Sequence, residues 1–284
     1  KRTVVDGLDL AIPRGSVYGF LGPNGSGKST AMKMLLGLLH PSAGQIFLLG
    51  EDPWGEARAR LMPRIGSMIE HPPGYGHLTG AENMRLLARL LNLETTRIDR
   101  ALELVRLTDH RDRLQRTYSL GMKQRLGIAM ALAREPELLI LDEPTNGLDP
   151  AGIEEIRELM IHLASGGVTV MISSHLLDEI DRMADILGVL SQGRLVFQGS
   201  RKELFERSIP DLIVVTPQAN AAANLVRGCR LERNGIRVQG CGQEDAARLI
   251  VRLVQAGIPI SEVRRLQQSL EEVFMDLTGG AGVL

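Results

Sequence analysis

The stretch from Gly22 to Thr30 has the residue types and spacing of a phosphate-binding loop. It satisfies the pattern G-x-x-x-x-G-K-[ST] at every fixed position. In such a loop, unpaired backbone N–H groups and the dipole of the following helix converge on a phosphate. Lys28 would reach the outer phosphates of a nucleotide, and the Ser29 hydroxyl would hold Mg²⁺. The residues expected to contact the nucleotide are Asn24, Gly25, Ser26, Gly27, Lys28, Ser29 and Thr30.

The residues on either side of the loop support this interpretation. The apolar run Val17–Leu21 predicts a buried strand that enters the loop, and apolar residues at helical spacing follow between Ala31 and Leu38. A strand, a glycine-rich turn and a helix in this order form the context in which the pattern binds phosphate. The alternative, a flexible loop rich in glycine and serine, is disfavoured by this context.

A second group of polar residues follows the apolar run Leu138–Leu141. Asp142 and Glu143 stand at the carboxyl end of this predicted strand. Asp142 would hold Mg²⁺, directly or through water, and Glu143 would orient or deprotonate an attacking water. A further predicted strand, over 168–172, ends just before His175, and this position favours a contact between His175 and the terminal phosphate. A pair of solvated acids at a strand end is the alternative for the two carboxylates.

The whole chain has the composition of an ordinary globular protein. Its 284 residues are 44% apolar, enough for one large domain and a small one. The charges of the 33 basic and 34 acidic residues nearly cancel, so the net charge does not indicate a nucleic-acid partner. Cys229 and Cys241 lie far apart, which argues against a disulfide or zinc scaffold. No apolar run approaches the roughly 18 to 20 residues that cross a bilayer, and no secretory signal opens the chain.

Apolar runs and turn residues predict the elements that must position these side chains. Strands are expected over residues 3–12, 16–21, 45–49, 65–69, 138–141 and 168–172. Glu70 ends the fourth of these strands, and the stretch His71–Gly76 is too rich in proline and glycine for regular structure. Thr79 and Glu82 form a capping box that begins a helical section, with helices expected over 79–91 and about 97–107.

The stretch Tyr118–Arg125, which reads Y-S-L-G-M-K-Q-R, resembles the signature sequence of the ATP-binding subunits of ABC transporters, in the variant common among exporter subunits with a separate permease. Ser119 and Gly121 stand at the start of a predicted helix, which makes a second anion site. The stretch 144–149 is similar to the family's D-loop, with Asp149 as its acid, and His175 matches the family's switch histidine. The resemblance covers roughly residues 1–210.

The resemblance implies an α/β fold with a P-loop NTPase core, the ABC-type ATP-binding domain, over residues 1–208 and a helical insert at about 77–133. It implies that ATP and Mg²⁺ are held between the phosphate loop of one chain and the signature of a second copy, arranged head to tail. Ser119, Gly121 and Asp149 would complete the nucleotide site. Glu143 and His175 would be catalytic. The chain would drive an integral-membrane permease from the cytoplasmic face of the cell membrane, as a peripheral subunit.

Glu70 departs from the family pattern, which usually has a glutamine here that contacts Mg²⁺ or the attacking water. A glutamate adds negative charge near the phosphates unless Mg²⁺ or a proton offsets it. Glu70 is therefore a candidate for both the catalytic and the metal-binding set. A glutamate at this place is similar to the ATPase subunits of bacterial self-protection transporters for lantibiotics and bacitracin-like peptides, as are the stretches 65–72 and 146–153. The alternative is a neutral change from glutamine to glutamate in a generic exporter of a drug, lipid or ion.

The family's adenine-stacking aromatic residue normally precedes the first strand by a few positions. No aromatic residue occurs from Lys1 to Val5. The aromatic residue is therefore expected to precede Lys1, or the base is held in another way.

The composition shifts after about residue 207, and a small accessory domain is predicted over 209–278, with a tail at 279–284. Strands are expected at 211–215, 235–239 and 260–266, and helices at 219–226 and 244–256. This pattern favours an α+β domain of ferredoxin-like character, and it contains no catalytic constellation. A packing stripe is expected from Leu270, Val273, Phe274 and Leu277.

Three classes of function are compared. The sequence favours the ATPase subunit of an exporter, with an antimicrobial peptide or antibiotic as cargo. An ABC-type ATPase acting on DNA or ribosomes usually carries two cassettes or a long coiled-coil insert, and neither is present here. A nucleotide-binding module without turnover would be signalled by loss of the catalytic acid, and Glu143 is present.

Overall fold

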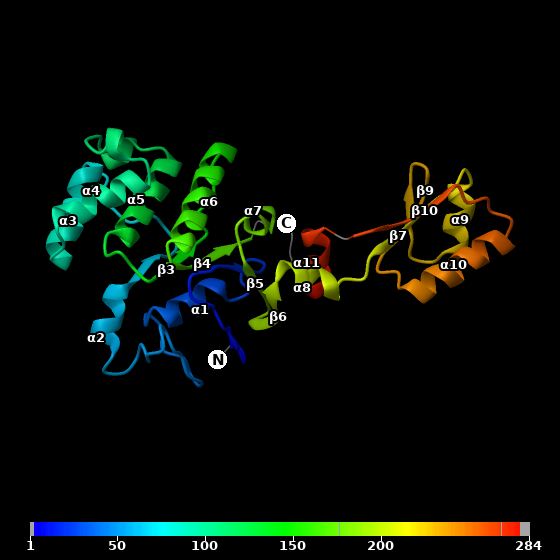
Figure 1. The fold of residues 1–284 in the computed structure, drawn as a ribbon, viewed down its shortest axis with the longest axis horizontal. Coiled ribbons are helices and arrows are strands. Elements are labelled where there is room, and N and C mark those ends of the chain that lie inside the picture. Colours follow the sequence, from blue (N-terminus) through cyan, green and yellow to red (C-terminus); the bar gives the residue numbers. More distant parts are fainter. Residues whose placement is uncertain (1–2, 176, 268, 279–284) are drawn as a thin grey trace. The chain divides into compact units, whose positions relative to one another are not determined.

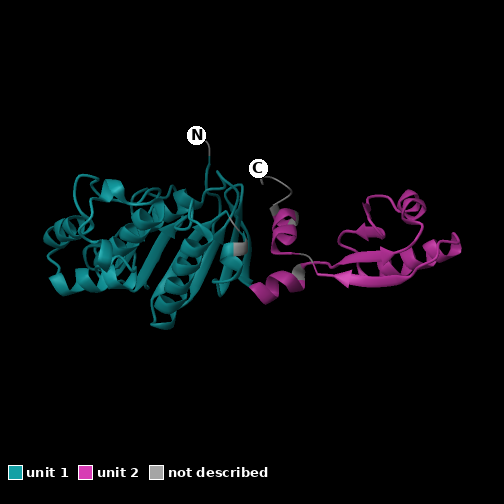
Figure 2. Cartoon of the chain, turned by 90° about the horizontal axis from the view of Figure 1, so that it is seen from above, with its two compact units in different colours: residues 1–200, 280–284 teal, residues 201–279 magenta. Residues whose placement is uncertain are grey.

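The computed structural model describes residues 3–175, 177–267 and 269–278. The chain divides into two compact units, and the division falls after Ser200 (Figure 2). It therefore lies at the start of helix α8 (Arg201–Arg207), whereas the sequence places it after residue 208. Each unit has a sheet of its own.

The first unit is built on a six-stranded sheet with the strand order β2-β3-β4-β1-β5-β6. Neighbouring strands are parallel, except that β5 and β6 form an antiparallel hairpin. Because the carboxyl ends of parallel strands meet at one edge, the loops that follow β1 to β4 lie at the same edge. The strands are β1 (Val17–Leu21), β2 (Ile65–Met68), β3 (Leu138–Asp142), β4 (Thr169–Ser174), β5 (Ile186–Ser191) and β6 (Arg194–Ser200).

Helices connect the parallel strands of this unit (Figure 1). They are α1 (Lys28–Leu35), α2 (Arg58–Leu61), α3 (Gly80–Leu91), α4 (Thr95–Leu104), α5 (Leu120–Leu132), α6 (Pro150–Ser165) and α7 (Leu177–Asp181). Three short 3₁₀ helices lie between them, at Met62–Arg64, Thr108–His110 and Gln115–Thr117. The order of elements agrees with the predicted α/β core, and α3 to α5 form the predicted helical insert.

The strands are apolar runs because helices cover both faces of the parallel sheet. All five residues of β1 and of β3 are buried. Tyr18 and Phe20 of β1 pack with Met32 of α1 in the main core, together with Ile140 and Met171 of the neighbouring strands. This packing fixes β1 and α1, and therefore the phosphate loop between them.

Two of the predicted strands are wrong. Residues 3–12 have the expected alternation, with Leu8, Leu10 and Ile12 half-buried, but no neighbouring strand pairs with them. Instead, the N–H of Ala11 donates to Gln198 Oε1 at 3.1 Å. Apolar alternation predicts an extended chain with one buried face, and it does not supply the partner strand that a ladder needs.

The second incorrect strand is 45–49, which contains only an isolated bridge between Leu48 and Glu51. Leu49 and Gly50 both have positive φ angles, 52° and 84°. These two residues reverse the chain direction directly after Leu48, so the extended segment is too short to form a strand ladder. The expected continuation of α1 to Leu38 is also absent, since the helix ends at Leu35 and Leu38 is 62% exposed.

The capping box at the start of the insert is confirmed. The Thr79 side chain accepts a hydrogen bond from the Glu82 N–H at 3.1 Å, and Glu82 accepts one from the Thr79 N–H at 2.7 Å. The hydrogen bond from the Thr79 N–H to the carboxylate is the main reason that the pKa of Glu82 is lowered. Helix α4 begins at Thr95 and ends at Leu104, slightly before the predicted range.

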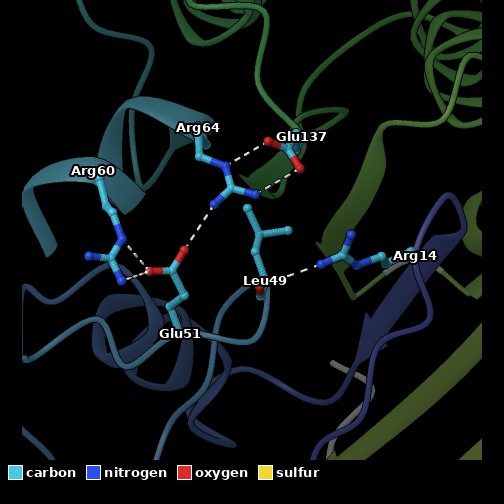
Figure 3. A network of polar contacts seen from close by, with 6 residues as sticks. All are labelled: Arg14, Leu49, Glu51, Arg60, Arg64 and Glu137. Atoms are coloured by element: carbon cyan, nitrogen blue, oxygen red, sulfur yellow. Dashed lines mark hydrogen bonds and ion pairs between the residues drawn. The ribbon is translucent and has the colours of Figure 1, made fainter. Parts of the chain in front are cut away.

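A network of ion pairs joins the segments before β2 and β3 (Figure 3). Arg64 pairs with Glu137 through two hydrogen bonds of 2.6 and 3.0 Å. Glu51 joins both Arg60 and Arg64, and Arg14 donates to the carbonyl oxygen of Leu49. The Arg64 contact holds the pKa of Glu137 below its ordinary value. Because these residues precede the strands, the network lies at the amino ends of β2 and β3, away from the loops that follow them.

The second unit has a four-stranded antiparallel sheet with the order β10-β7-β9-β8. Its elements run β-α-β-β-α-β along the chain, which is the ferredoxin-like arrangement. The predicted small α+β domain is therefore confirmed. The strands are β7 (Asp211–Val215), β8 (Arg230–Glu232), β9 (Gly235–Val238) and β10 (Glu262–Leu266), and the helices are α8, α9 (Ala219–Leu225), α10 (Gln243–Gln255) and α11 (Leu270–Thr278).

This unit has its own core, in which Leu212, Val214 and Ile236 pack with Leu253 of α10. Strand β8 was not predicted from the sequence, because its three residues are all exposed and show no apolar pattern. Of the predicted stripe, Leu270, Val273 and Phe274 are buried, and Leu277 is half-buried. Cys229 and Cys241 are free thiols. The tail at 279–284 lies outside the described residues. No helix in the described ranges is long and apolar enough to cross a bilayer.

Candidate nucleotide site

Four adjacent strands end beside one another in the first unit, and each is followed by a candidate residue. In the order β2-β3-β4-β1, the following residues are Glu70, Glu143, His175 and the phosphate loop. The register places Asp142 of β3 opposite Ser173 of β4, and Ser173 opposite Phe20 of β1. The topology thus gathers at one edge residues that are spread over the sequence from Gly22 to His175.

The phosphate loop leads directly into α1, whose first residue is Lys28. Gly27 caps this helix with a φ of 111°, a backbone conformation that residues other than glycine rarely adopt. A Cβ at Gly27 would also lie 3.0 Å from the carbonyl oxygen of Val4. The turn between β5 and β6 also holds the loop, because the Gly193 N–H donates to the Ser26 carbonyl oxygen at 2.9 Å.

The Lys28 side chain is folded inside this loop. Its ammonium donates to the carbonyl oxygen of Gly22 at 2.6 Å and lies 3.4 Å from that of Pro23. Burial lowers the pKa of Lys28, and the nearby charges of Glu143 and Asp142 act in the opposite direction. On balance the pKa of Lys28 is lowered, and its ammonium group lies near two carboxylates.

One polar atom of the loop has no partner in the described structure. Ser26 Oγ is buried, the residue being 3% exposed, and it makes no hydrogen bond. A buried hydroxyl without a partner costs free energy unless a ligand supplies one. A phosphate in the loop would supply the acceptor.

Asp142 is held by two hydroxyl groups. Ser29 Oγ donates to Asp142 Oδ2 at 2.7 Å, and Ser173 Oγ donates to Asp142 Oδ1. Asp142 is 7% exposed, so both of its oxygens are oriented before any ligand binds. Ser29 and Asp142 are therefore adjacent, in contact with each other.

Glu143 leaves the strand in a left-handed conformation, with a φ of 49°. Its N–H donates to Ser173 Oγ at 3.0 Å and to the Ser173 carbonyl oxygen at 3.2 Å. Its carboxylate Oε2 lies 3.0 Å from His175 Nδ1. Such a backbone conformation in a non-glycine residue costs roughly 1 to 3 kcal/mol, and the surrounding contacts maintain it.

Glu70 also has a left-handed backbone, with a φ of 67°. Its carboxylate forms an ion pair with the ammonium of Lys33, which lies on α1 one turn after Ser29. The hydrogen bond from Lys33 is the main reason that the pKa of Glu70 is lowered.

A cleft of about 530 Å³ joins several of these residues. It brings together Ser29, Glu70, Asp142 and Glu143 from the strand ends, and it is closed on another side by residues of α5 and of the loop after β3. The lining residues are Ser29, Glu70, His71, Pro72, Leu120, Gln124, Asp142, Glu143, Asn146 and Gly147.

Ser119, Gly121 and Asp149 do not line this cleft. Ser119 caps α5 by accepting the Met122 N–H at 3.2 Å, and Asp149 caps α6 by accepting the Gly152 N–H at 3.1 Å. Within one chain, Ser119, Gly121 and Asp149 thus lie at the starts of two helices and are not part of the cleft lining, although Leu120 between the first two is.

Three residues of the site were missed by the sequence interpretation. Ser173 bridges Asp142 and Glu143, and its position at the end of a strand beside His175 could have revealed it. Lys33 follows Ser29 by four residues, which places both on one helix face. Gln124 lines the cleft with a buried Oε1 that has no hydrogen-bond partner among the described atoms, and only the folded structure reveals this.

The donor set suits Mg²⁺. Ser29 and Asp142 supply hard oxygen atoms in direct contact, and the carboxylates of Glu70 and Glu143 line the same cleft. Mg²⁺ prefers such ligands and usually takes its remaining ones from phosphates and water. The described residues include no group of three or more His, Cys, Asp or Glu that could hold a metal.

The strand order, the phosphate loop and the strand-end acids define a P-loop nucleotide-binding protein. The family model of the ABC transporter matches residues 5–146. The chain is 39% identical to the bacitracin transport ATP-binding protein BcrA of Enterococcus faecalis, over 100% of this chain and 94% of BcrA. It is 44% identical to the lantibiotic transport ATP-binding protein SrtF of Streptococcus pyogenes, over 74% of this chain and 92% of SrtF. The chain therefore belongs to the ATP-binding proteins of ABC transporters.

A solved structure of the ATP-binding subunit of an ABC transporter supports the same fold. It superimposes with a TM-score of 0.65 at 30% identity, over 72% of this chain and 86% of the other. As a member of this family, the protein binds ATP and hydrolyses it to drive transport, and it resembles the subunits for bacitracin and lantibiotics. Subunits of this family dimerise and work with membrane permease components.

Proposed function

We propose that this chain powers the export of an antimicrobial peptide or a related antibiotic, as part of a self-resistance system. The observation that carries the proposal is Glu70, a glutamate at the end of β2 that lines the cleft with the strand-end acids. The likeness to transport ATPases named for bacitracin and for lantibiotics supports the same class of cargo.

The residues of the cleft have separate roles in this proposal. The phosphate loop and Lys28 would bind the phosphates of ATP, and Ser29 and Asp142 would hold Mg²⁺, with Glu70 as a further oxygen ligand. Bound Mg²⁺ would neutralise charge on the phosphate oxygens. Glu143 orients the attacking water and accepts its proton, because its carboxylate lines the cleft and its backbone is tied to Ser173.

His175 supports Glu143 in this arrangement. Its Nδ1 lies 3.0 Å from Glu143 Oε2, which restricts the rotation of the carboxylate. The side chain of His175 is 36% exposed, so its ring is also accessible to the terminal phosphate. We propose that His175 contacts both the Glu143 carboxylate and the terminal phosphate of ATP.

A second copy of the chain would complete the site. Ser119, Gly121 and Asp149 lie at the starts of α5 and α6, outside the cleft of their own chain. We propose that they face the ATP bound by the second copy. Catalysis then depends on closure of the dimer, since Ser119 and Gly121 add their donors to the terminal phosphate only in the closed state.

The permease is proposed to dock beside the loop that follows Glu70. This loop presents Tyr75, which is 56% exposed, and Asn83 of α3 fixes its backbone through hydrogen bonds of 2.7 and 3.1 Å. Leu86 and Leu90 of α3 are also exposed. A rigid, partly apolar surface of this kind fits a short segment of an integral-membrane permease. The chain would then lie at the cytoplasmic face of the cell membrane.

The test is the ATPase rate of the chain copurified with its permease, with and without a panel of antimicrobial peptides. Glu143→Gln should lower the rate at least about a hundredfold while ATP still binds, because a general base is lost. A peptide should stimulate the wild type, and Glu70→Gln should weaken that stimulation.

Normal ATPase activity without an effect of any peptide, together with no effect of Glu70→Gln, would remove the peptide cargo from the proposal. The chain would then be the ATPase of an exporter for another cargo, such as a drug, lipid or ion. Full activity of Glu143→Gln would show that the catalytic base is a different residue.

A further inference from the structure

Lys33 is a charged residue beside the cleft to which the proposed mechanism gives no role. It lies on α1 four residues after Ser29, so both side chains project from the same face of the helix. Its ammonium is paired with the carboxylate of Glu70, which comes from the end of β2. The side chains are 30% and 59% exposed, so a ligand entering the cleft can reach the pair.

The three acids that line the cleft have different partners. Asp142 accepts hydrogen bonds from Ser29 and Ser173, and Glu143 is in contact with His175. Glu70 has the Lys33 ammonium as its partner. Lys33 therefore supplies a full positive charge to the acid that differs from the family's usual glutamine.

A glutamine at this position would need no such partner, because its amide carries no charge. An unpaired glutamate would repel the phosphates of a nucleotide and attract a divalent cation. The pair with Lys33 reduces both effects, since the carboxylate and the ammonium together have no net charge. The pair also directs Glu70 toward α1, on the same helix face as Ser29.

We propose that Lys33 is a positioning residue for Glu70, which offsets its charge and sets how strongly the cleft favours metal over nucleotide. The inference rests on the proposed role of the cleft as the ATP site. Lys33 holds the carboxylate of Glu70 beside the cleft, and this carboxylate would be available as an oxygen ligand for Mg²⁺ when the nucleotide is bound. Lys33 thereby makes a glutamate compatible with a site that must admit a polyanion.

Removal of the lysine charge has two opposite consequences. In Lys33→Met, Glu70 is uncompensated, so binding of ATP without metal should weaken by about two- to fivefold, the range expected for an exposed ion pair. Binding of Mn²⁺ to the chain with ATP should strengthen by a similar factor. Lys33→Arg keeps the charge and should behave as the wild type.

The experiment uses the full-length chain and two binding measurements that do not depend on turnover. Fluorescence of a trinitrophenyl analogue of ATP, titrated in EDTA, reports binding of the nucleotide alone. Electron paramagnetic resonance of free Mn²⁺ reports metal binding at a saturating nucleotide concentration. The variants are Lys33→Met, Lys33→Arg, Glu70→Gln and the double variant Lys33→Met/Glu70→Gln.

The double variant decides the mechanism. Glu70→Gln removes the charge that Lys33 offsets. Adding Lys33→Met to Glu70→Gln should therefore change neither the dissociation constant of the ATP analogue nor that of Mn²⁺. A comparison within the Glu70→Gln background also remains informative if Lys33→Met does not fold. If Lys33→Met weakens nucleotide binding equally in both backgrounds, Lys33 acts independently of Glu70 and the inference is wrong.

Lys28→Ala separates this inference from the proposed function. Loss of nucleotide binding in Lys28→Ala, with wild-type constants in Lys33→Met, overturns the role of Lys33 and leaves the ATP site intact. Undiminished nucleotide binding in Lys28→Ala would overturn the site itself.

Discussion

Ser173 joins the two carboxylates at the end of β3, Asp142 and Glu143. Its hydroxyl donates to Asp142 Oδ1 and accepts the N–H of Glu143, so one side chain holds both neighbours. It is fully buried, and water cannot replace it without local rearrangement. One fully buried serine can thus orient both the proposed metal ligand and the proposed base.

Ser173→Ala should reduce both stability and turnover. A hydrogen bond to a charged group contributes about 1.5 to 3 kcal/mol, and the unfolding free energy should fall by about that amount. Because Glu143 loses one of its two backbone anchors, kcat should fall more than the KM for ATP rises. Urea denaturation and steady-state ATPase kinetics measure the two effects.

The exposed Ser67 of β2 offers a matched control, and Ser67→Ala should leave both quantities within error of the wild type. Unchanged kinetics in Ser173→Ala would mean that the carboxylates are oriented without the serine hydroxyl.

Helix α5 and the loop after β2 approach each other closely at Gly127. A Cβ on Gly127 would lie 2.5 Å from Met68 Sδ, 3.1 Å from Pro73 Cδ and 3.4 Å from Pro72 Cα. The loop that carries Glu70 and Tyr75 is therefore packed directly on the helix that begins with the signature. This contact offers a physical route between the proposed permease surface and the proposed second-copy surface.

Gly127→Ala should push this loop away from α5. Overpacking of this kind costs about 1 to 3 kcal/mol of stability. Because the loop moves, stimulation of the ATPase by the permease and peptide should decrease more than the affinity for ATP. The measurements are the stimulated rate in the complex and binding of the fluorescent ATP analogue.

Gly55→Ala is the corresponding control, since its Cβ would meet only ordinary contacts at 3.7 to 3.8 Å. Equal effects of Gly127→Ala on stimulated rate and ATP affinity would argue that α5 and the loop do not act as one coupling element.

Some elements could be predicted from the sequence, and others depend on pairing that no local pattern contains. The strands β1, β3 and β4 are long apolar runs followed by motif residues, so their identity and the clustering of their ends could be inferred. Residues 3–12 alternate in the same way as a strand and remain unpaired. The pair of Lys33 and Glu70 joins two segments 37 positions apart, and only the strand order brings them together.

At the scale of the whole molecule, two units with separate cores share one chain. The second unit contains a buried charge that must remain paired. Asp211 is fully buried, bound by Arg237 at 2.6 Å and by the Gly240 N–H at 2.9 Å. Arg237 also pairs with Glu272 of α11 and so joins that helix to the sheet. The cleft proposed as the ATP site is lined by residues of the first unit.

Arg237→Met should therefore destabilise the second unit alone. A buried carboxylate that loses its cation typically costs about 3 to 5 kcal/mol. Calorimetry of the full-length chain should show two transitions, of which the one for the second unit falls by more than about 10 °C. ATP should raise only the transition of the first unit, because a ligand stabilises the unit that binds it. Arg248→Met, which removes the exposed pair with Asp245, should leave both transitions in place. If Arg237→Met lowers both transitions together, the two units unfold as one cooperative structure, and the second unit contributes to the stability of the ATP site.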